Sequence, residues 1–391
     1  MKLYGILFTF ILLIGLSSCR DKFLTRTSVQ DYVDKFVDVV KFKHQGILSL
    51  NKTAIRQIWS FFKAKYRRFY SSTKEERARL RVFRDKLKYV LEANLRKAST
   101  YKLGLNEFSN WTSEEYQRMV HGVKVSSRFR RSLIDDEPDE DSLERSLARF
   151  DQRYYYARRD ENNNDTSQQP NTFDWRTKNV VSPIKHQGYC GSCYAFATVA
   201  VMESLYAIKT NSQNVTQFSE QQIVDCSSKG NSGCCGGNFE PSVKFLSEKG
   251  GKIAIEASYP YAEKLALCQK SGTNEIELGE IKYEKLARGN EKKLAEAVAN
   301  YGPIFVAVDA SSEDFGTYRK GVLQIDRCHK RRVTHAVVVV GYGYDEAIQK
   351  PYWIIKNSWG TGWGENGYLR LIKDAGNMCG VATQAYAAKL I

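Results

Sequence analysis

Proline is sparse in this chain, with 7 residues among 391, and glycine, with 27, is at its ordinary level of about 7%. Such proportions exclude a collagen-like or low-complexity protein. One continuous apolar run is present, at residues 3–16, and it is shorter than the roughly 20 residues that span a bilayer. No other stretch approaches that length, which excludes a polytopic membrane protein. The composition, 42% hydrophobic and 26% charged, is that of a globular protein long enough for two domains.

Positive charge is distributed unevenly along the chain, whose formal net charge is +15. Residues 1–170 hold 33 Lys and Arg against 22 Asp and Glu, whereas residues 171–391 hold 26 against 22. A basic half of this kind is more often a helical segment with an intramolecular or membrane-surface role than a reader of nucleic acid. No nucleic-acid-binding motif is present, so we expect no nucleic-acid partner.

The N-terminus has the layout of a secretory signal peptide. The apolar run follows Lys2, the small residues Ser17 and Ser18 come next, and charged residues begin at Arg20. The alternative is an uncleaved anchor, for which the run is short. We predict a signal peptide at residues 1–18 and the secretory pathway as destination. Lysosome, vacuole and extracellular space all remain open.

The cysteines agree with export. Eight of the nine lie within residues 190–379, which suggests disulfides in an oxidising compartment. Glycosylation sequons are also present, and they begin at Asn51, Asn110, Asn164 and Asn214.

Two segments precede the cysteine-rich part. Residues 52–119 contain no proline and are predicted to be mainly helical. Residues that recur at intervals of three or four within it form one stripe on a helix: Glu75, Arg79, Phe83, Lys86, Val90 and Asn94. Residues 122–170 are too polar for a packed core, with an acidic run at 135–141, and are predicted to be a flexible linker.

A candidate nucleophile lies at the start of a buried helix. The segment QGYCGSCY at 187–194 precedes an alanine-rich apolar stretch that ends at residue 209. Cys193 would therefore lie in the first helical turn, where the helix dipole favours the thiolate. The downstream segments 333–344 and 352–356 are predicted strands. Helices first and strands second indicate an α+β domain with two unlike halves.

Partners for this thiol are present in order along the chain. His335 lies at a predicted strand start and can act as acid and base, and Asn357 can orient its imidazole. Gln187 and the Cys193 N–H can form an oxyanion hole. The alternatives are a redox pair or half a zinc site at Cys190 and Cys193. A redox pair lacks the expected βαβ start, and a zinc site lacks a second spaced pair. We therefore expect no metal and no cofactor.

Residues 171–391 resemble a papain-like cysteine protease. The resemblance rests on the Cys193 motif and on DWR at 174–176, GCCGG at 233–237, GYG at 341–343 and NSWG at 357–360. It implies a helical lobe facing a β-barrel-like lobe, with Cys193 on one wall of a cleft and His335 with Asn357 on the other. It also implies the disulfides Cys190–Cys234, Cys226–Cys268 and Cys328–Cys379, which leave Cys235 as an unpaired thiol.

The helical stripe resembles the inhibitory pro-segment of cathepsin L-like enzymes, with Lys86 where Asn is usual and Val90 where Ile is. A second motif around Gly104, Asn106 and Phe108 also matches, with Asn110 in place of Asp. By resemblance, this pro-segment runs through the cleft in the non-productive direction. The predicted domains are a signal peptide (1–18), a helical inhibitory pro-segment (19–121), a charged linker and activation region (122–170) and a peptidase domain (171–391).

These features predict a cysteine endopeptidase made as a zymogen, acting through a Cys193 acyl-enzyme. The resemblance implies a set of substrate-contacting residues: Gly236, Gly237, Asn238, Phe239, Ala307, Val333, Ala336, Trp359 and Gln384. Their mostly apolar character predicts an apolar residue two positions before the cut. Alternatives are an exopeptidase of the same family and a catalytically silent inhibitor or binding protein. Expected partners are peptide and protein substrates, the chain's own pro-segment and cystatin-type inhibitors, with the chain acting as a monomer.

Overall fold

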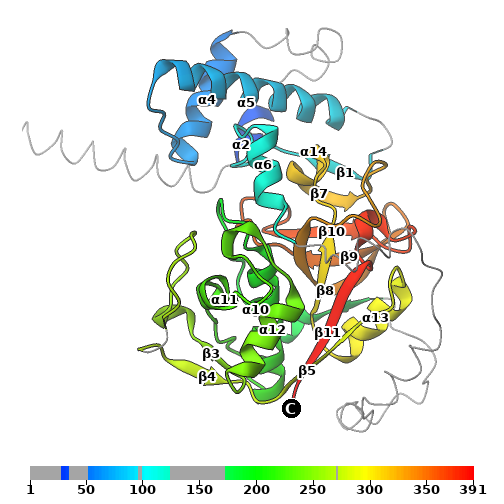
Figure 1. Cartoon of the computed structure of the whole chain (residues 1–391). Coiled ribbons are helices and arrows are strands. Elements are labelled where there is room, and N and C mark those ends of the chain that lie inside the picture. Colours follow the sequence, from blue (N-terminus) through cyan, green and yellow to red (C-terminus); the bar gives the residue numbers. More distant parts are fainter. Residues whose placement is uncertain (1–27, 35–51, 96–98, 124–171, 270–271) are drawn as a thin grey trace, which may run out of the picture. The chain divides into compact units, whose positions relative to one another are not determined.

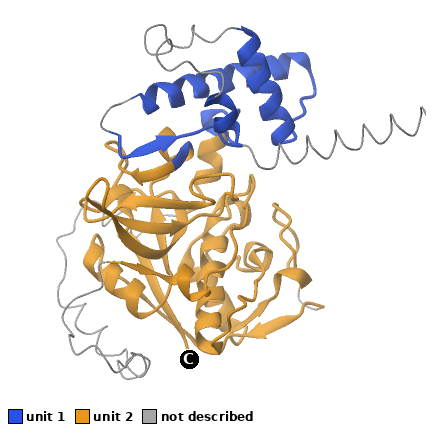
Figure 2. Cartoon of the chain, turned by 180° about the vertical axis from the view of Figure 1, so that it is seen from behind, with its two compact units in different colours: residues 1–114, 317–319 blue, residues 115–316, 320–391 orange. Residues whose placement is uncertain are grey.

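The computed structural model describes residues 28–34, 52–95, 99–123, 172–269 and 272–391. These residues belong to two compact units (Figure 2): unit 1 covers 1–114 and 317–319, and unit 2 covers 115–316 and 320–391. The predicted signal peptide, Asn51, Asn164 and linker residues 124–170 lie outside the described residues. Within the described ranges, no helix combines the length and apolar character needed to cross a membrane.

Unit 1 is mainly helical, as predicted. Its elements are α2 (Val29–Asp34), α4 (Lys52–Lys65), α5 (Thr73–Asn94), β1 (Tyr101–Leu103) and the first residues of α6 (Ser113–Val120). A capping motif begins α5, since Ser72 Oγ accepts a hydrogen bond from the Glu75 N–H at 3.2 Å and Glu75 Oε2 accepts from the Ser71 N–H at 2.9 Å. All six residues of the predicted stripe lie on this helix.

An aromatic core holds unit 1 together. Trp59 and Phe62 of α4 pack on Phe83 of α5, with ring centroids 5.1 and 4.8 Å from that of Phe83, and all three rings are buried. At the end of α5, the Asn94 side chain exchanges two hydrogen bonds of 2.9 Å with the backbone of Leu103. This contact fixes β1 against the helix.

The chain turns directly after β1, which spans only three residues. The strand ends at Leu103, because the Asn106 side chain accepts a hydrogen bond from the Phe108 N–H at 3.0 Å and turns the chain.

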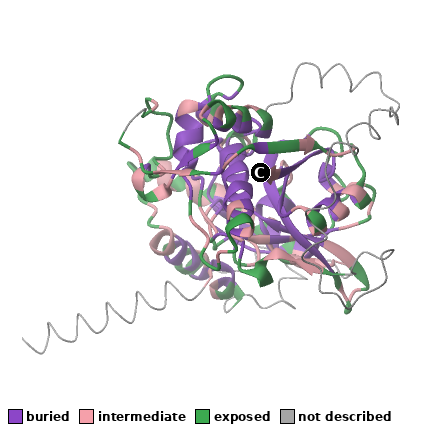
Figure 3. Cartoon of the chain, turned by 90° about the horizontal axis from the view of Figure 1, so that it is seen from below, coloured by how far each residue is buried: buried purple, intermediate pink, exposed green. Residues whose placement is uncertain are grey.

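The first lobe of unit 2 is built on α10 (Cys193–Thr210). Its other elements are α11 (Glu220–Cys226), α12 (Phe239–Glu248), the paired strands β3 (Lys252–Ala254) and β4 (Glu275–Glu277), and the 3₁₀ helices η2 (Trp175–Lys178), η3 (Gly233–Cys235) and η4 (Glu256–Ser258). Helices α11 and α12 contact α10, and β6, β8 and β11 also contact it (Figure 1). Because it is covered in this way, α10 is buried along most of its length (Figure 3).

The second lobe is formed by strands. They are β5 (Ile281–Lys285), β6 (Ile304–Val308), β7 (Tyr318–Leu323), β8 (His335–Asp345), β9 (Lys350–Lys356), β10 (Tyr368–Ile372) and β11 (Gln384–Leu390), accompanied by α13 (Glu291–Asn300), α14 (Glu313–Gly316) and η5 (Met378–Gly380). Their order in the sheet is β7-β10-β9-β8-β6-β11-β5, and β2 (Phe173–Asp174) pairs with β8. Antiparallel pairing sets Lys356 at the end of β9 opposite Val338 near the start of β8.

The α+β fold class with two unlike lobes is confirmed. One predicted boundary is wrong: the linker was expected to begin at residue 122, but Gly122 and Val123 are buried and hydrogen-bonded within unit 2. The prediction failed because Gly122 and Val123 directly precede a polar segment and have no sequence feature that sets them apart from it.

Candidate active site

Cys193 is the first residue of α10 and is completely buried. Its Sγ accepts a hydrogen bond from the Ala336 N–H at 3.3 Å, which brings the start of β8 against the sulfur. The preceding loop is fixed by the Cys190–Cys234 disulfide and by the Gly191 N–H, which donates to the Cys234 carbonyl at 3.0 Å. The sulfur therefore has a defined position at the positive end of a long helix.

His335 and Asn357 come together at one edge of the sheet. His335 begins β8 and Asn357 follows β9, so their antiparallel pairing makes them neighbours. The His335 Nε2 lies 2.8 Å from Asn357 Oδ1, and because an amide oxygen only accepts, Nε2 carries a proton. The Trp359 ring stacks on the imidazole with centroids 4.7 Å apart. His335 Nδ1 is buried and has no hydrogen-bond partner among the described residues.

Gln187 connects the two lobes beside this group. Its Oε1 accepts hydrogen bonds from Ser358 Oγ at 2.7 Å and from Trp359 Nε1 at 3.2 Å. Its Nε2 donates one hydrogen to the Cys190 carbonyl at 3.0 Å. The side chain is thus held on both sides, and its second amide hydrogen has no acceptor at hydrogen-bond distance in the part of the chain that the structure describes.

Residues 122–123 cross the site. The Gly122 carbonyl accepts a hydrogen bond from the Gly237 N–H at 3.0 Å, and the Val123 N–H donates to the Thr334 carbonyl at 3.1 Å. Val123 pairs with Gly237 in the parallel sense. A Cβ atom at position 122 would lie 2.5 Å from Cys193 Sγ, so a side chain does not fit here without displacement. The backbone of this segment covers the thiol.

Burial controls the charges of the Cys193 thiol and the His335 imidazole. It raises the pKa of Cys193 to about 12, although hydrogen bonds from backbone N–H groups act in the opposite sense. It lowers the pKa of His335 to about 4, although the hydrogen bond to Asn357 raises it. Both groups are therefore neutral near pH 7. The thiolate favoured by the helix position is absent from the covered site, since surroundings of low polarity disfavour both charges.

This charge state predicts that acid uncovers the site. An exposed imidazole has a pKa of about 6.5, so between that value and about 4 the open state binds more protons than the covered state. The covered state is fully stable above about pH 6.5 and loses up to about 3 kcal/mol as the pH falls to about 4. We expect amide exchange of residues 115–123, corrected for intrinsic rates, to accelerate over this window in the Cys193→Ser chain. An equal acceleration in Cys193→Ser/His335→Phe would assign the effect to other groups.

Gly122→Ala should loosen the covering segment. The added Cβ would meet Cys193 Sγ and, at 2.7 Å, the Gly191 carbonyl oxygen. At about pH 7, we expect iodoacetamide to label Cys193 of the intact chain about tenfold faster. A Cys235→Ser background removes the exposed thiol from the assay. Gly362→Ala is the matched control, because a Cβ at position 362 meets no atom within 4 Å. Equal labelling rates in both variants would contradict the crowding argument.

The sequence profile described as papain family cysteine protease matches residues 169–389, and that of the cathepsin propeptide inhibitor domain matches residues 59–116. The chain belongs to the papain family of cysteine proteases. It is a cathepsin L-like peptidase preceded by an inhibitory propeptide, as the sequence predicted.

Relatives share both parts of the chain. Digestive cysteine proteinase 1 of Homarus americanus is 36% identical over 344 residues, covering 87% of this chain and 96% of that protein. Cathepsin L1 of Drosophila melanogaster is 33% identical over 334 residues, covering 84% of each chain. The structure of digestive procathepsin L2 proteinase from the larval midgut of Tenebrio molitor has a TM-score of 0.72 at 33% identity, covering 86% of this chain and all of that one.

Two of the residues predicted to contact substrate lie against Gly122. Gly237 bonds to Gly122, and a Cβ at Gly236 would lie 3.0 Å from the Gly122 oxygen. Four further residues belong to one buried apolar cluster with Val123: Phe239, Ala307, Val333 and Ala336.

The two polar members of the predicted pocket bind each other. Gln384 Nε2 donates to Asn238 Oδ1 at 2.6 Å, and both side chains are buried. Asn238 Oδ1 also accepts from the Phe239 N–H and caps α12. Neither side chain points into solvent, so the pocket wall has few unsatisfied polar groups.

The three disulfides have the pairing that the resemblance implied: Cys190–Cys234, Cys226–Cys268 and Cys328–Cys379. Cys235 is exposed and is not in a disulfide.

One predicted glycosylation site needs correction. Asn110 is buried, and its Nδ2 donates to Tyr70 Oη at 3.0 Å. A glycan on this nitrogen is incompatible with the packing of unit 1. Asn214 is exposed, and its glycosylation remains a prediction.

A buried charge cluster lies near Asn357 and Ser358. Glu203 of α10 is fully buried and accepts hydrogen bonds from Lys185 Nζ at 2.8 Å, Ser182 Oγ at 2.5 Å and the Phe218 N–H at 2.8 Å. Lys185 also pairs with Glu220 at 2.7 Å. These bonds tie the segment before the nucleophile to α10 and α11.

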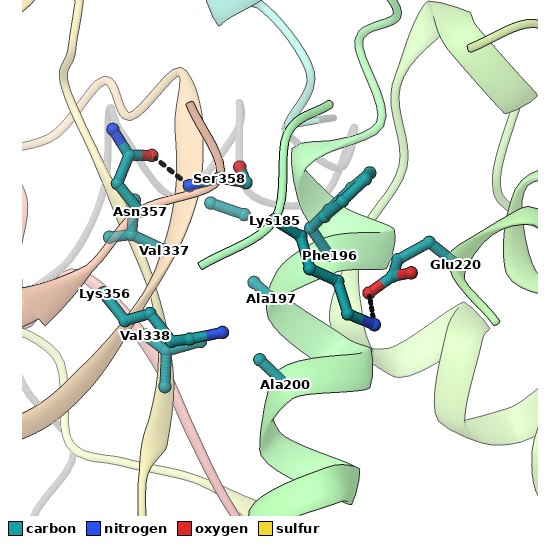
Figure 4. A pocket seen from close by; sticks show the side chains of 11 residues that line it. Lys185, Phe196, Ala197, Ala200, Glu220, Val337, Val338, Lys356, Asn357 and Ser358 are labelled. Carbon is teal, nitrogen blue, oxygen red and sulfur yellow. Dashed lines mark hydrogen bonds and ion pairs between the residues drawn. The ribbon is translucent and has the colours of Figure 1, made fainter. Parts of the chain in front are cut away.

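Lys356 extends this cluster to the other lobe. The Lys356 Nζ donates to Ser182 Oγ and to the Pro183 carbonyl, each at 3.1 Å. Lys356 directly precedes Asn357 in the chain. Its side chain lies beside a small cavity between α10 and β8 (Figure 4). Burial lowers the pKa of Lys356 to about 8, so the ammonium is charged in acid. Asn357 is thus connected through its neighbour Lys356 and through Ser182 to Glu203.

Sequence reasoning missed this cluster and the segment 122–123. Glu203 did carry a signal, because it is a charged residue inside an otherwise apolar helix, which normally requires a buried partner. Gly122 carried none that distinguishes it from a linker glycine, since its role depends on contacts with residues far along the chain.

Proposed function

We propose that the chain, once its propeptide is removed, hydrolyses peptide bonds with Cys193 as nucleophile, His335 as acid and base, Asn357 as its orienting partner and Gln187 in the oxyanion hole. One observation carries this proposal: the buried imidazole is bound through Nε2 to Asn357, and its Nδ1 has no partner among the residues with a described structure, while the next residue, Ala336, contacts the sulfur. Removing the covering segment rehydrates both groups and so favours the thiolate and imidazolium.

The reaction then has two stages. The Cys193 thiolate attacks the peptide carbonyl carbon, and the resulting oxyanion accepts hydrogen bonds from Gln187 Nε2 and the Cys193 N–H. The Nδ1–H of His335 protonates the amide nitrogen, the amine leaves, and a thioester remains. Nδ1 next takes a proton from water, whose oxygen attacks the thioester. The acid product leaves as sulfur is expelled from the tetrahedral intermediate, and the thiolate and imidazolium are restored.

Substrate selection follows from the apolar residues of the predicted pocket, four of which share one buried cluster with Val123. We expect Leu, Val or Phe two residues before the cut, preferred at least about fivefold over charged residues there, because burial of an apolar side chain is favourable and the wall's amides bind each other. The test is a positional library of peptides blocked at both ends, which an endopeptidase cleaves and an exopeptidase does not. Preference for Asp at this position would contradict the assignment.

The proposal includes a route and partners. We infer passage through the secretory pathway, with the lysosome, a vacuole or the extracellular space as destination, from the predicted leader and the three disulfides. The enzyme acts as a monomer on peptides and proteins. Cystatin-type inhibitors would compete with substrate for the cleft.

A further inference from the structure

The loop that leads into β8 is strongly basic. We call residues 326–332 the basic loop. It carries five exposed basic side chains: Arg327, His329, Lys330, Arg331 and Arg332. Asp326 is its single acidic residue. Salt bridges within the described part of the chain involve none of these side chains.

The backbone of the basic loop is fixed. Cys328 is bonded to Cys379, and the His329 N–H donates to Asp309 Oδ2 at 2.7 Å. Asp309 is fully buried, and its other oxygen accepts from the N–H and hydroxyl of Ser311. Both oxygens of the Asp309 carboxylate are thus used in hydrogen bonds to His329 and Ser311, and they form no ion pair with the exposed basic side chains of the loop in the described residues.

The basic loop borders the substrate cleft. Val333, the next residue, belongs to the proposed pocket, and the Thr334 carbonyl binds the propeptide backbone. The Lys330 carbonyl accepts a hydrogen bond from Thr383 Oγ1 at 2.5 Å, and Thr383 precedes Gln384 of the same pocket. A peptide seated in the pocket therefore passes close to the loop's cations.

We propose that the basic loop selects substrates with Asp or Glu at the two positions that flank the residue pair between the pocket and the cut, outside the pocket itself. This inference rests on the proposed function and adds a substrate class to it. Exposed ion pairs contribute modestly, so two such pairs predict a preference of about fivefold in kcat/KM. Because the Debye length falls to about 3 Å at 1 M salt, the preference should vanish there. A sulfated polysaccharide is the competing ligand, and the position beside the cleft favours peptides.

The test uses full-length protein matured in acid and titrated for active sites. Three fluorogenic peptides, blocked at both ends, share one apolar residue two positions before the cut. They carry Glu, Gln or Lys at two places: three positions before the cut and directly after it. At about pH 6, where carboxylates are ionised, we expect a Glu to Gln ratio in kcat/KM of about five in dilute buffer and about one in 1 M NaCl. Arg331→Gln/Arg332→Gln should bring the ratio to about one, and Arg331→Glu/Arg332→Glu should favour the Lys peptide.

The matched control is Lys244→Gln/Lys292→Gln, which removes two exposed lysines from α12 and α13 and should keep the parental ratio. Equal hydrolysis of the Glu and Gln peptides by the parent, or a ratio unaffected in the loop variants, would overturn the inference. A second outcome would also overturn the inference: the loop variants lose retention on heparin but keep the Glu to Gln ratio of the parent. The loop would then bind polyanions. Hydrolysis of none of the peptides would contradict the proposed function and this inference with it.

Discussion

Replacing Cys193 by alanine is expected to lower kcat/KM for a peptide substrate by at least about 10⁴-fold. The substitution removes the atom that forms the thioester, whereas the groups around it, Gln187 and the His335–Asn357 pair, remain in place. These groups still bind the substrate and partly stabilise the charge that develops during the reaction, and this accounts for a small part of the enzyme's rate enhancement. The propeptide of the variant should be removed by added parental enzyme, which is then inactivated and separated before assay.

The matched control for this experiment is Cys235→Ala. Cys235 is the other unpaired cysteine among the described residues and is exposed next to the Cys190–Cys234 bond. Its replacement should leave kcat/KM within about twofold of the parent, because no catalytic contact involves it. Undiminished hydrolysis by Cys193→Ala, or a comparable loss in Cys235→Ala, would show that the nucleophile is assigned to the wrong sulfur.

Glu203→Gln is expected to destabilise unit 2 by about 3–5 kcal/mol. The neutral amide cannot balance Lys185 and Lys356, which would stay in the interior with Glu220 as the remaining nearby carboxylate. It also has one oxygen, whereas Glu203 uses two to accept three hydrogen bonds. We expect the thermal midpoint, followed by near-ultraviolet circular dichroism, to fall by about 10 °C.

Glu248→Gln provides the comparison for this loss. Glu248 is exposed at the end of α12, and its ion pair with Lys229 at 3.3 Å is on the surface. Its substitution should change the free energy of unfolding by less than about 0.5 kcal/mol. Similar midpoints for the two variants would mean that the buried cluster contributes no more than a surface pair.

Local sequence was sufficient for much of this fold. The buried helix at Cys193 could be predicted because alanine and apolar residues continue without a break, and α5 because charged and apolar residues recur at helical spacing. The family resemblance, now confirmed, supplied the pairing of three disulfides and the set of residues around the cleft. Motif spacing could bring Cys193, His335 and Asn357 into one hypothesis.

Other features depend on contacts between distant parts of the chain. The composition around Gly122 is that of a linker, and the need for glycine there follows from the clash that a Cβ would make with Cys193 Sγ and the Gly191 carbonyl oxygen. The neutral state of the thiol and imidazole follows from their burial, which sequence does not report. Asn110 matches a glycosylation sequon, but its contact with Tyr70 removes the side chain from solvent.

The most direct test of the account is the site of modification by a thiol-directed epoxide before and after acid maturation. In a mass map of the peptides, we predict one modification per molecule, on Cys193, in matured protein, with activity lost in proportion to it. In the intact chain at neutral pH we predict little or none at Cys193, because residue 122 covers the sulfur and the thiol is protonated. Full inactivation without modification of Cys193, or equal modification of Cys193 in the two states, would contradict the account.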